Sequence, residues 1–311
     1  MSTVIPGRRH RSGSAPSHRA RTAVLLLGLV AAAVVLGGCG DDEGDPGEAT
    51  PTTSAVQGPR APGTVGSARE LSERMTAAAR REGTVSVRVD PQGGTGTSSA
   101  GGLRLKGETP EFTMSLENAD NPLTMVAVSE GVFLRLPEEL DGNRWLKLTS
   151  TLDDIKGDDT FSEIYAEVVD SIRSNIDVVR LAAGFELASS FRAQGPETVN
   201  GAATTKYTIT LGEEALRAQL SPHAQGKVGE QLAGATATVD VFVDAEGLPR
   251  QIITSTQADG RTLTSTVTYW AWGEKVSIKT PPSKDVAKVA DYPDTSQLTR
   301  RLQRQLQQSQ P

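Results

Sequence analysis

The sequence holds few of the residue types that build most catalytic and metal sites. Cysteine occurs once, at Cys39, and only one of the three histidines, His223, follows the first 38 residues. A single cysteine rules out an internal disulfide framework, so a hydrophobic core must hold the fold together. One histidine cannot form a histidine-based zinc site, and a Ser-His-Asp or Cys-His arrangement would have to use it. We interpret His223, which stands in a polar stretch, as an exposed loop residue.

Positive charge and aromatic side chains are also scarce. The chain has 32 Lys and Arg against 38 Asp and Glu, and aromatic residues make up only 4% of it. Five basic residues and no acidic ones lie within the first 38 positions, so the remainder carries 27 basic minus 38 acidic residues, a formal charge of about -11. An acidic surface is repelled by phosphates, and the sequence has no basic stripe with interleaved aromatics. The composition therefore argues against a nucleic-acid partner.

At its start, the chain contains the pattern of a bacterial export signal. Five arginines and no acidic residue occupy the first 22 positions, as in the positive region of a signal peptide. Fourteen uncharged residues follow at 23–36, fewer than the roughly 20 that span a bilayer as a helix. The run ends in Leu36-Gly37-Gly38-Cys39, which looks like a lipobox. In lipoproteins with this motif the cysteine thiol receives a diacylglyceryl group, and cleavage before the cysteine makes it the first residue of the mature protein. We predict that residues 1–38 are a lipoprotein signal peptide.

Cys39 is the predicted lipidation site, and residues 39–66 are the predicted lipid anchor and flexible tether. Two acyl chains, at about 0.8 kcal/mol per buried methylene, would hold the protein stably on the outer face of the cytoplasmic membrane. The alternative is a secreted protein whose cysteine merely falls near a cleavage site. Residues 40–66 are rich in Gly, Pro, Thr and acidic residues, and such a coil reaches roughly 30 Å. We interpret the acidic run at 41–45 as a solvated part of this tether rather than a cation site.

Residues 67–290 are predicted to form one folded domain that opens with a helix. Ser67-Ala68-Arg69-Glu70 has the form of a capping box, and Gly83 is placed to end the helix after Arg81. Beyond Gly83 the apolar residues alternate, as they do in strands with one buried face. The alternation predicts an antiparallel meander of about six strands, around residues 85–89, 103–105, 112–116, 123–128, 132–136 and 145–148.

A helical period returns between Asp158 and Leu181, where one face is strongly apolar. Two short helices are predicted between Glu213 and Leu232. Further strands are predicted around 196–199, 205–211, 239–243, 248–256, 263–270 and 276–278. The predicted fold is α+β, with a single curved antiparallel sheet of about ten or eleven strands and the helix from Asp158 over its concave face. Residues 291–311 form a polar C-terminal tail that is predicted to be disordered.

Two features that could suggest chemistry have simpler interpretations. Gly93-Gly94-Thr95-Gly96 joins two predicted strands and lacks the Gly-Lys-Ser/Thr ending of a phosphate loop, so it is predicted to be a hairpin loop. The acidic pairs at 153–154 and 158–159 are expected to cap the following helix. A Gly-x-Ser-x-Gly nucleophile elbow does not occur. We therefore predict a protein that is not an enzyme and has no cofactor or metal, although the sequence leaves a glycosidase-type carboxylate pair open.

Several turn motifs carry a resemblance to a known family. They are Gly195-Pro196-Glu197-Thr198-Val199-Asn200-Gly201, then Thr204-Thr205-Lys206-Tyr207, then Val241-Phe242-Val243-Asp244-Ala245-Glu246-Gly247-Leu248-Pro249, and Trp272-Gly273 ahead of Pro281-Pro282. Together with the lipobox, the tether and the order of predicted elements, they make residues 67–290 resemble the LppX/LprAFG group of actinobacterial lipoproteins, relatives of the LolA/LolB carriers. The tail at 291–311 and the few aromatics depart from the family pattern.

The resemblance implies a curved antiparallel half-barrel whose helices cross the open face and enclose an apolar cavity for acyl chains. It implies that the protein binds a lipid or an acylated glycolipid and carries or presents it in the cell envelope. A half-barrel of this kind also occurs in RseB-like regulators, which read envelope stress and hold a protein partner. The resemblance therefore leaves open a sensor or interaction module, with a membrane transporter or sensor protein as its partner.

The candidate cavity lining comes from the inward faces of the meander and of the long helix. Composition alone allows either a lipid-sized cavity or a directly packed core at this place, and the resemblance favours the cavity. Val, Leu and Met suit acyl chains because they are smooth and make no directional demands. The candidate residues are Leu105, Met114, Leu116, Met125, Leu134, Leu136, Ile164 and Val168.

Overall fold

The computed structural model describes most of the predicted domain and little beyond it. The described residues are 64–92, 97–105, 109–117, 123–140, 142–148, 169, 172–219, 232–258, 261–289 and 300. The predicted signal peptide, Cys39, nearly all of the tether and nearly all of the tail lie outside these ranges.

The domain opens with helix α1, Ala68–Glu82, as the capping-box pattern predicts. The Ser67 hydroxyl accepts a hydrogen bond from the Glu70 amide at 3.1 Å, and the Glu70 carboxylate accepts one from the Gly66 amide at 2.6 Å. Both bonds satisfy amide groups that a helix start leaves without partners. The helix ends at Gly83, whose φ of 74° lies in the left-handed region that glycine adopts without strain.

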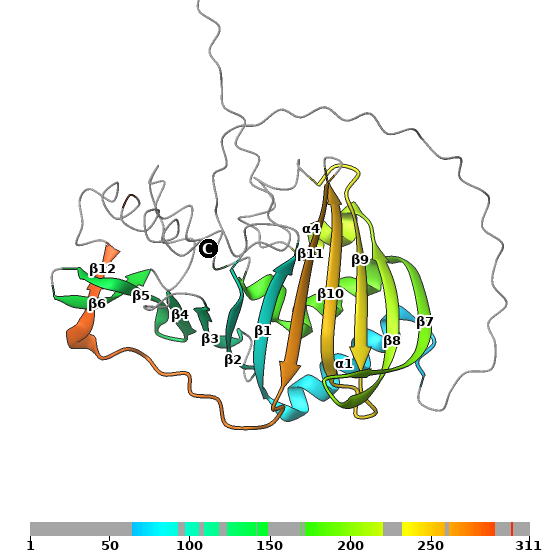
Figure 1. Cartoon of the computed structure of the whole chain (residues 1–311), viewed down its shortest axis with the longest axis horizontal. Helices are drawn as coiled ribbons and strands as arrows, with labels where there is room; N and C mark the ends of the chain where they lie inside the picture. Colours follow the sequence, from blue (N-terminus) through cyan, green and yellow to red (C-terminus); the bar gives the residue numbers. More distant parts are fainter. Residues whose placement is uncertain are drawn as a thin grey trace, which may run out of the picture.

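The sheet is a single open layer of twelve strands. Strands β1 to β6 form one antiparallel meander, β7 to β11 form a second, and an antiparallel pair between β1 and β11 joins them (Figure 1). The order across the sheet is β12-β6-β5-β4-β3-β2-β1-β11-β10-β9-β8-β7. The strands are β1 Thr84–Gln92, β2 Ser99–Arg104, β3 Glu111–Leu116, β4 Thr124–Val128, β5 Gly131–Leu140, β6 Asn143–Leu148, β7 Ala188–Val199, β8 Ala202–Leu211, β9 Thr236–Val243, β10 Pro249–Ala258, β11 Arg261–Trp270 and β12 Val286–Lys288. The predicted class, a curved antiparallel sheet with helices, is confirmed, and the predicted first meander is correct.

The twelfth strand differs from the prediction. The sequence predicted a last strand at Val276–Ile278, but these residues belong to a strap, residues 271–285, that crosses the outer face of the first meander. There Ile278 is buried against Val126 and Phe133. The strap ends in β12, which pairs with β6 in parallel and makes the sheet mixed (Figure 1).

The helical region before β7 also differs from the prediction. Residues 172–176 are helical, but Asp177 is extended and starts a separate helix, α3 Val178–Gly184, followed by the 3-10 turn η2 Phe185–Leu187. A single helix running to Leu181 was therefore the wrong prediction at its C-terminal end. Its predicted start, including the acidic pairs at 153–154 and 158–159, lies outside the described residues.

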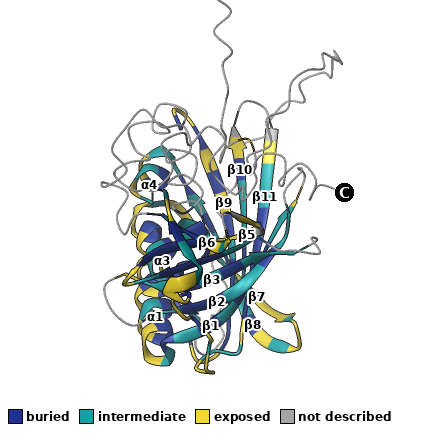
Figure 2. Ribbon diagram, turned by 90° about the vertical axis from the view of Figure 1, so that its left-hand side faces the viewer, coloured by how far each residue is buried: buried dark blue, intermediate teal, exposed yellow. Residues whose placement is uncertain are grey.

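The remaining helices are short. Helix α4, Glu213–Ala218, is the first of the two predicted between Glu213 and Leu232, and the second lies outside the described ranges. A 3-10 turn, η3 Ser283–Asp285, precedes β12. Helices α1, α3 and α4 stack along one side of the sheet (Figure 2), and we call the sheet face beneath them the inner face. No helix within the described part of the chain is long and apolar enough to cross a membrane.

Candidate functional site

The inner face carries an apolar row that crosses the whole first meander. Residues directly opposite one another in paired strands point to the same face, so the register defines the row. Every side chain in it is 7% exposed or less. In order across the sheet, the row is Val87, Gly101, Met114, Met125, Leu134, Leu146 and Ala287.

A second buried row runs parallel to the first, two residues along each strand. It consists of Val85, Leu103, Phe112, Ala127, Val132 and Leu148. The first row is rich in Met and Leu, whereas the second has no Met and holds the aromatic ring of Phe112. The two rows together form a continuous apolar surface that makes no demand on hydrogen bonding.

The structure places three of the eight predicted lining residues, Met114, Met125 and Leu134, in this surface. Leu105 lies outside the two rows but belongs to the same buried core cluster. Leu116 is only half-buried, and it lies opposite Ser99. Ile164, Val168 and the side chain of Leu136 lie outside the described residues. That these side chains line a cavity stays a prediction.

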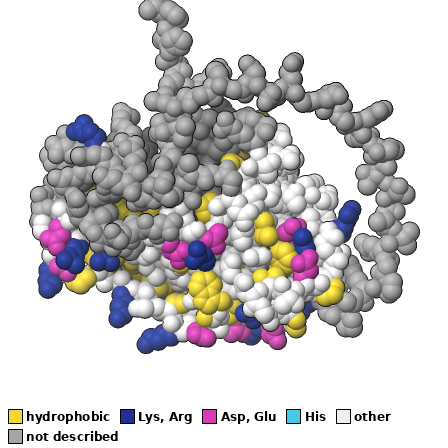
Figure 3. Space-filling view, viewed as in Figure 1, with side chains coloured by type: hydrophobic (Ala, Val, Ile, Leu, Met, Phe, Trp, Pro, Cys, Tyr) yellow, Lys and Arg dark blue, Asp and Glu magenta, His cyan; other side chains and the backbone are white. Residues whose placement is uncertain are grey.

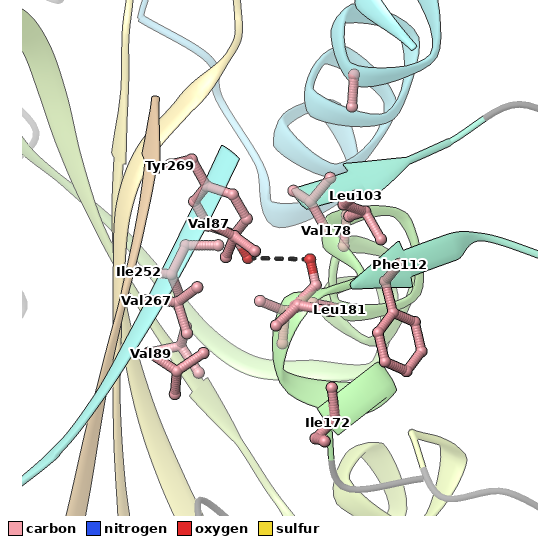
Figure 4. Close-up of a cluster of buried hydrophobic side chains, with 14 of the residues drawn as sticks. Val87, Val89, Leu103, Phe112, Ile172, Val178, Leu181, Ile252, Val267 and Tyr269 are labelled. Atoms are coloured by element: carbon pink, nitrogen blue, oxygen red, sulfur yellow. Dashed lines mark hydrogen bonds between the residues drawn. The ribbon is translucent and has the colours of Figure 1, made fainter. Parts of the chain in front are cut away.

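Helix α3 covers part of the inner face next to β1 and β11. Figure 4 shows Val178 and Leu181 of this helix among buried side chains of the sheet. The Tyr269 hydroxyl of β11 donates a hydrogen bond to the Ile176 carbonyl at 3.4 Å (Figure 4), which ties the helical segment before α3 to the sheet. Burial raises the pKa of Tyr269, and the nearby Asp177 carboxylate adds to the effect.

Trp272 fixes the start of the strap beside this contact. Its ring stacks on Tyr269 with centroids 5.9 Å apart, and its Nε1 donates to the Pro249 carbonyl at 3.1 Å. The Trp-Gly pair noted in the sequence therefore has a structural role, in which it anchors the exit of β11 to the start of β10.

Asp177 is the buried carboxylate of the helical cover. It is 9% exposed and accepts hydrogen bonds from the amides of Val179 at 3.0 Å and Arg180 at 3.3 Å, which cap α3. Burial raises the pKa of Asp177, because desolvation of the charged form outweighs these hydrogen bonds and the attraction of Arg180 and Arg173.

We expect Asp177→Asn to keep the cap and to change the pH dependence of folding. Because the folded pKa lies above the ordinary value of 3.8, the folded wild type binds more protons than the unfolded chain between these two values. The free energy of unfolding should therefore fall as pH rises through this window in the wild type, and this contribution should be missing from the Asn variant. Thermal melts across the acidic pH range measure it.

Asp177→Ala serves as the matched control, since it removes the cap as well as the charge. It should cost about 1 kcal/mol relative to the Asn variant. If the melting temperatures of the wild type and of Asp177→Asn change with pH by the same amount, the folded state does not raise the pKa of the Asp177 carboxylate, and the prediction is wrong.

The other sites considered in the sequence receive no support from the described residues. Among them, no group of three or more His, Cys, Asp or Glu side chains is arranged to hold a metal ion. On the face shown in Figure 3, Lys and Arg side chains lie interspersed with acidic ones and form no continuous basic stripe. His223 lies outside the described ranges.

One polar feature of the inner face was not predicted from the sequence. Ser99, Thr256 and Ser265 are buried there, although all three are hydrophilic residues. Short polar residues in strands carry no distinctive signal, because most of them face water.

Comparison with solved structures shows likeness of fold. LprF from Mycobacterium bovis is 12% identical with a TM-score of 0.45, over 70% of this chain and 97% of that one. Lipoprotein LppX from Mycobacterium tuberculosis is 18% identical with a TM-score of 0.43, over 68% and 98%. Both names belong to the group that the sequence resembles.

A structure of the Pseudomonas aeruginosa MucA/MucB complex is 11% identical with a TM-score of 0.33, over 70% of this chain and 59% of that one. No protein-family model and no curated protein matches the sequence. At these identities and scores the likenesses concern the path of the chain and assign no function to this protein.

Proposed function

We propose that this protein is a membrane-anchored lipoprotein that binds a lipid or another hydrophobic ligand and carries or presents it in the cell envelope. The observation that carries the proposal is the pair of apolar rows that runs unbroken from β1 to β6 on the inner face. A surface of Val, Leu and Met suits flexible acyl chains, which need area and no directed polar contacts.

The N-terminal segments complete the proposal. Residues 1–38 would direct export, lipidated Cys39 would hold the protein on the outer face of the cytoplasmic membrane, and residues 39–66 would let the domain reach its ligand. The ligand class that fits is a lipid or acylated glycolipid, and a membrane protein that gives or takes it is the expected partner. The eight predicted lining residues would contact the acyl chains. The proposal includes no catalytic step.

Met125→Trp tests the proposal, because Met125 lies in the middle of the first row. A tryptophan there would fill the space of an acyl chain, so the variant should bind lipid about tenfold more weakly, equivalent to about 1.4 kcal/mol of binding free energy, and should carry less extractable lipid after purification. Its melting temperature should stay close to that of the wild type. Mass spectrometry of solvent extracts and a thermal melt measure the two quantities.

Arg135→Trp is the matched control, since Arg135 is exposed on the neighbouring strand β5. It adds the same ring outside the inner face and should leave bound lipid unchanged. If Met125 is part of a solid core, its replacement should instead cost about 1 to 3 kcal/mol through overpacking. That loss of stability, together with a wild type that carries no lipid, would contradict the proposal.

A further inference from the structure

Three buried hydroxyl groups on the inner face have no hydrogen-bond partner among the residues that the structure describes. They belong to Ser99, Thr256 and Ser265, which are 2%, 1% and 2% exposed. An unsatisfied buried hydroxyl costs about 1 to 3 kcal/mol, and native structures hold few of them. Three on one face of one sheet therefore need an explanation.

The strand register places Thr256 and Ser265 close together, with Ser99 farther away on the same face. Ser99 lies opposite Val89 on β1, and Ser265 lies opposite Pro91, two residues further along the same strand. Thr256 lies opposite Leu263, two residues from Ser265, so Thr256 and Ser265 are diagonal neighbours about 7–8 Å apart. Ser99 is two strands away from Ser265, about 12 Å by strand spacing and rise. The three positions define a polar subsite, residues Ser99, Thr256 and Ser265.

All three belong to the inner face, next to the apolar surface. Val89 and Val267, which are buried on that face, are the immediate neighbours of Ser99 and Ser265. The polar subsite therefore continues the inner surface at the end of β1 and the beginning of β2.

Hydroxyls on the outer face of the same sheet behave differently. Ser255 and Thr264 hydrogen-bond each other across β10 and β11 at 3.1 Å, and Ser115 and Thr124 do so across β3 and β4 at 2.8 Å. These outward residues alternate with the inward ones along the strands. These two outward pairs are satisfied within the sheet, whereas Ser99, Thr256 and Ser265 have no partner among the described residues.

The surroundings of the polar subsite indicate a neutral ligand group. The inner-face residues opposite the three hydroxyls are Val89, Leu116, Pro91, Thr254, Ala237 and Leu263, none of which is charged. A phosphate or free carboxylate buried there would lack a counter-charge, which is costly. Hydroxyl donors without a cation suit the carbonyl oxygen of an ester.

We propose that Ser99, Thr256 and Ser265 donate hydrogen bonds to the ester carbonyl groups of an acyl ester lipid whose chains lie along the apolar rows. This inference rests on the proposed function, and it adds the polar residues that would hold the ester groups of the ligand. The alternative occupant of the same three hydroxyls is ordered water, which would show no preference between lipids.

Two matched probes test the proposal on the full-length protein, methyl palmitate and heptadecane, which share a chain of nearly the same length and differ in the ester. Each displaces the fluorescent dye N-phenyl-1-naphthylamine from the purified protein. The wild type should bind the ester more tightly than the alkane. Thr256→Val and Ser265→Ala, whose hydroxyls are near enough to share one ester carbonyl, should each reduce this preference by roughly two- to tenfold, and the triple variant that adds Ser99→Ala should abolish it while alkane binding is unchanged.

Ser255→Ala is the control, because it removes a hydroxyl from the outer face of the same strand as Thr256 and should leave the preference intact. The triple variant should melt at or above the wild-type temperature, since it removes buried polar groups that the protein itself does not satisfy. A wild type that binds both probes equally, or a triple variant that keeps the ester preference, would overturn the polar subsite and leave the proposed function standing. A wild type that binds neither probe would overturn both.

Discussion

Gly101→Ala should destabilise the domain by more than about 3 kcal/mol. A Cβ atom at Gly101 would overlap the backbone carbonyl of Thr113 and would lie 2.9 Å from the Met114 Cα. These are backbone atoms of the paired strand β3, so they cannot rotate away as a side chain could. β2 and β3 would have to separate, which would interrupt the first apolar row. Chemical denaturation monitored by circular dichroism measures the loss.

Gly102→Ala is a closely matched control for this prediction. It is the next residue of the same strand, and its added Cβ would lie 3.1 Å from side-chain atoms of Val276 in the strap. The strap side chain can shift, and the lost glycine freedom stabilises by about 0.4 to 1 kcal/mol through the unfolded state. Its net effect should stay within about 1 kcal/mol. Equal stabilities of the two alanine variants would show that β2 does not approach β3 as closely as described.

Cys39→Ser should abolish lipidation and release the protein from stable membrane anchoring. A serine hydroxyl cannot form the thioether that joins the acyl-bearing glycerol to cysteine, and both acyl chains are lost with it. Metabolic labelling with an alkyne fatty acid should mark the wild type and leave the variant unmarked. Detergent-phase partitioning should shift the variant to the aqueous phase.

Gly40→Ser, which places the same new residue one position further on, keeps the cysteine and should still be labelled. Persistent labelling of Cys39→Ser would show that the anchor lies elsewhere in the chain. Equal labelling loss in both variants would mean that the neighbourhood of the motif, rather than the cysteine itself, determines modification.

Local patterns predicted the first meander and its leading helix well. Ser67, Glu70 and Gly83 mark the ends of α1 by their own hydrogen bonds and backbone angles, so the sequence around them is sufficient. Strict alternation of buried residues, as in Val85, Val87 and Val89, identifies both a strand and its inward face. Short turns then leave antiparallel pairing as the only arrangement.

Tertiary effects explain the elements that were missed. The strap holds Val276 and Ile278 in alternation, but these residues pack across strands instead of pairing with one. β12 is three residues long, and it pairs with β6 only because the strap places it beside that strand. The break at Asp177 interrupts an apolar period that continues in α3, so periodicity alone could not find it.

β7 began eight residues before its predicted start for a related reason. It is an edge strand, and its first residues from Ala188 are mostly exposed and polar. With only one neighbour and little burial, such a strand has no alternating pattern to detect.

The candidate site was predictable only as a set of inward positions. Met114, Met125 and Leu134 were expected on the buried side and lie there. Periodicity reports which face of a strand is buried and not what covers it, so it cannot distinguish an acyl chain from a packed helix. The polar subsite was invisible to the same reasoning, because a buried serine looks like a solvent-facing one in the sequence.

Native mass spectrometry of the full-length protein tests the central claim most directly. A lipid held on the inner face is bound without a covalent bond, whereas the acyl chains on Cys39 are covalent. The native spectrum should therefore show an added lipid mass that disappears on denaturation, while the mass of the anchor remains in both spectra. The same protein mass under native and denaturing conditions, in wild type purified from its own membrane, would contradict the account.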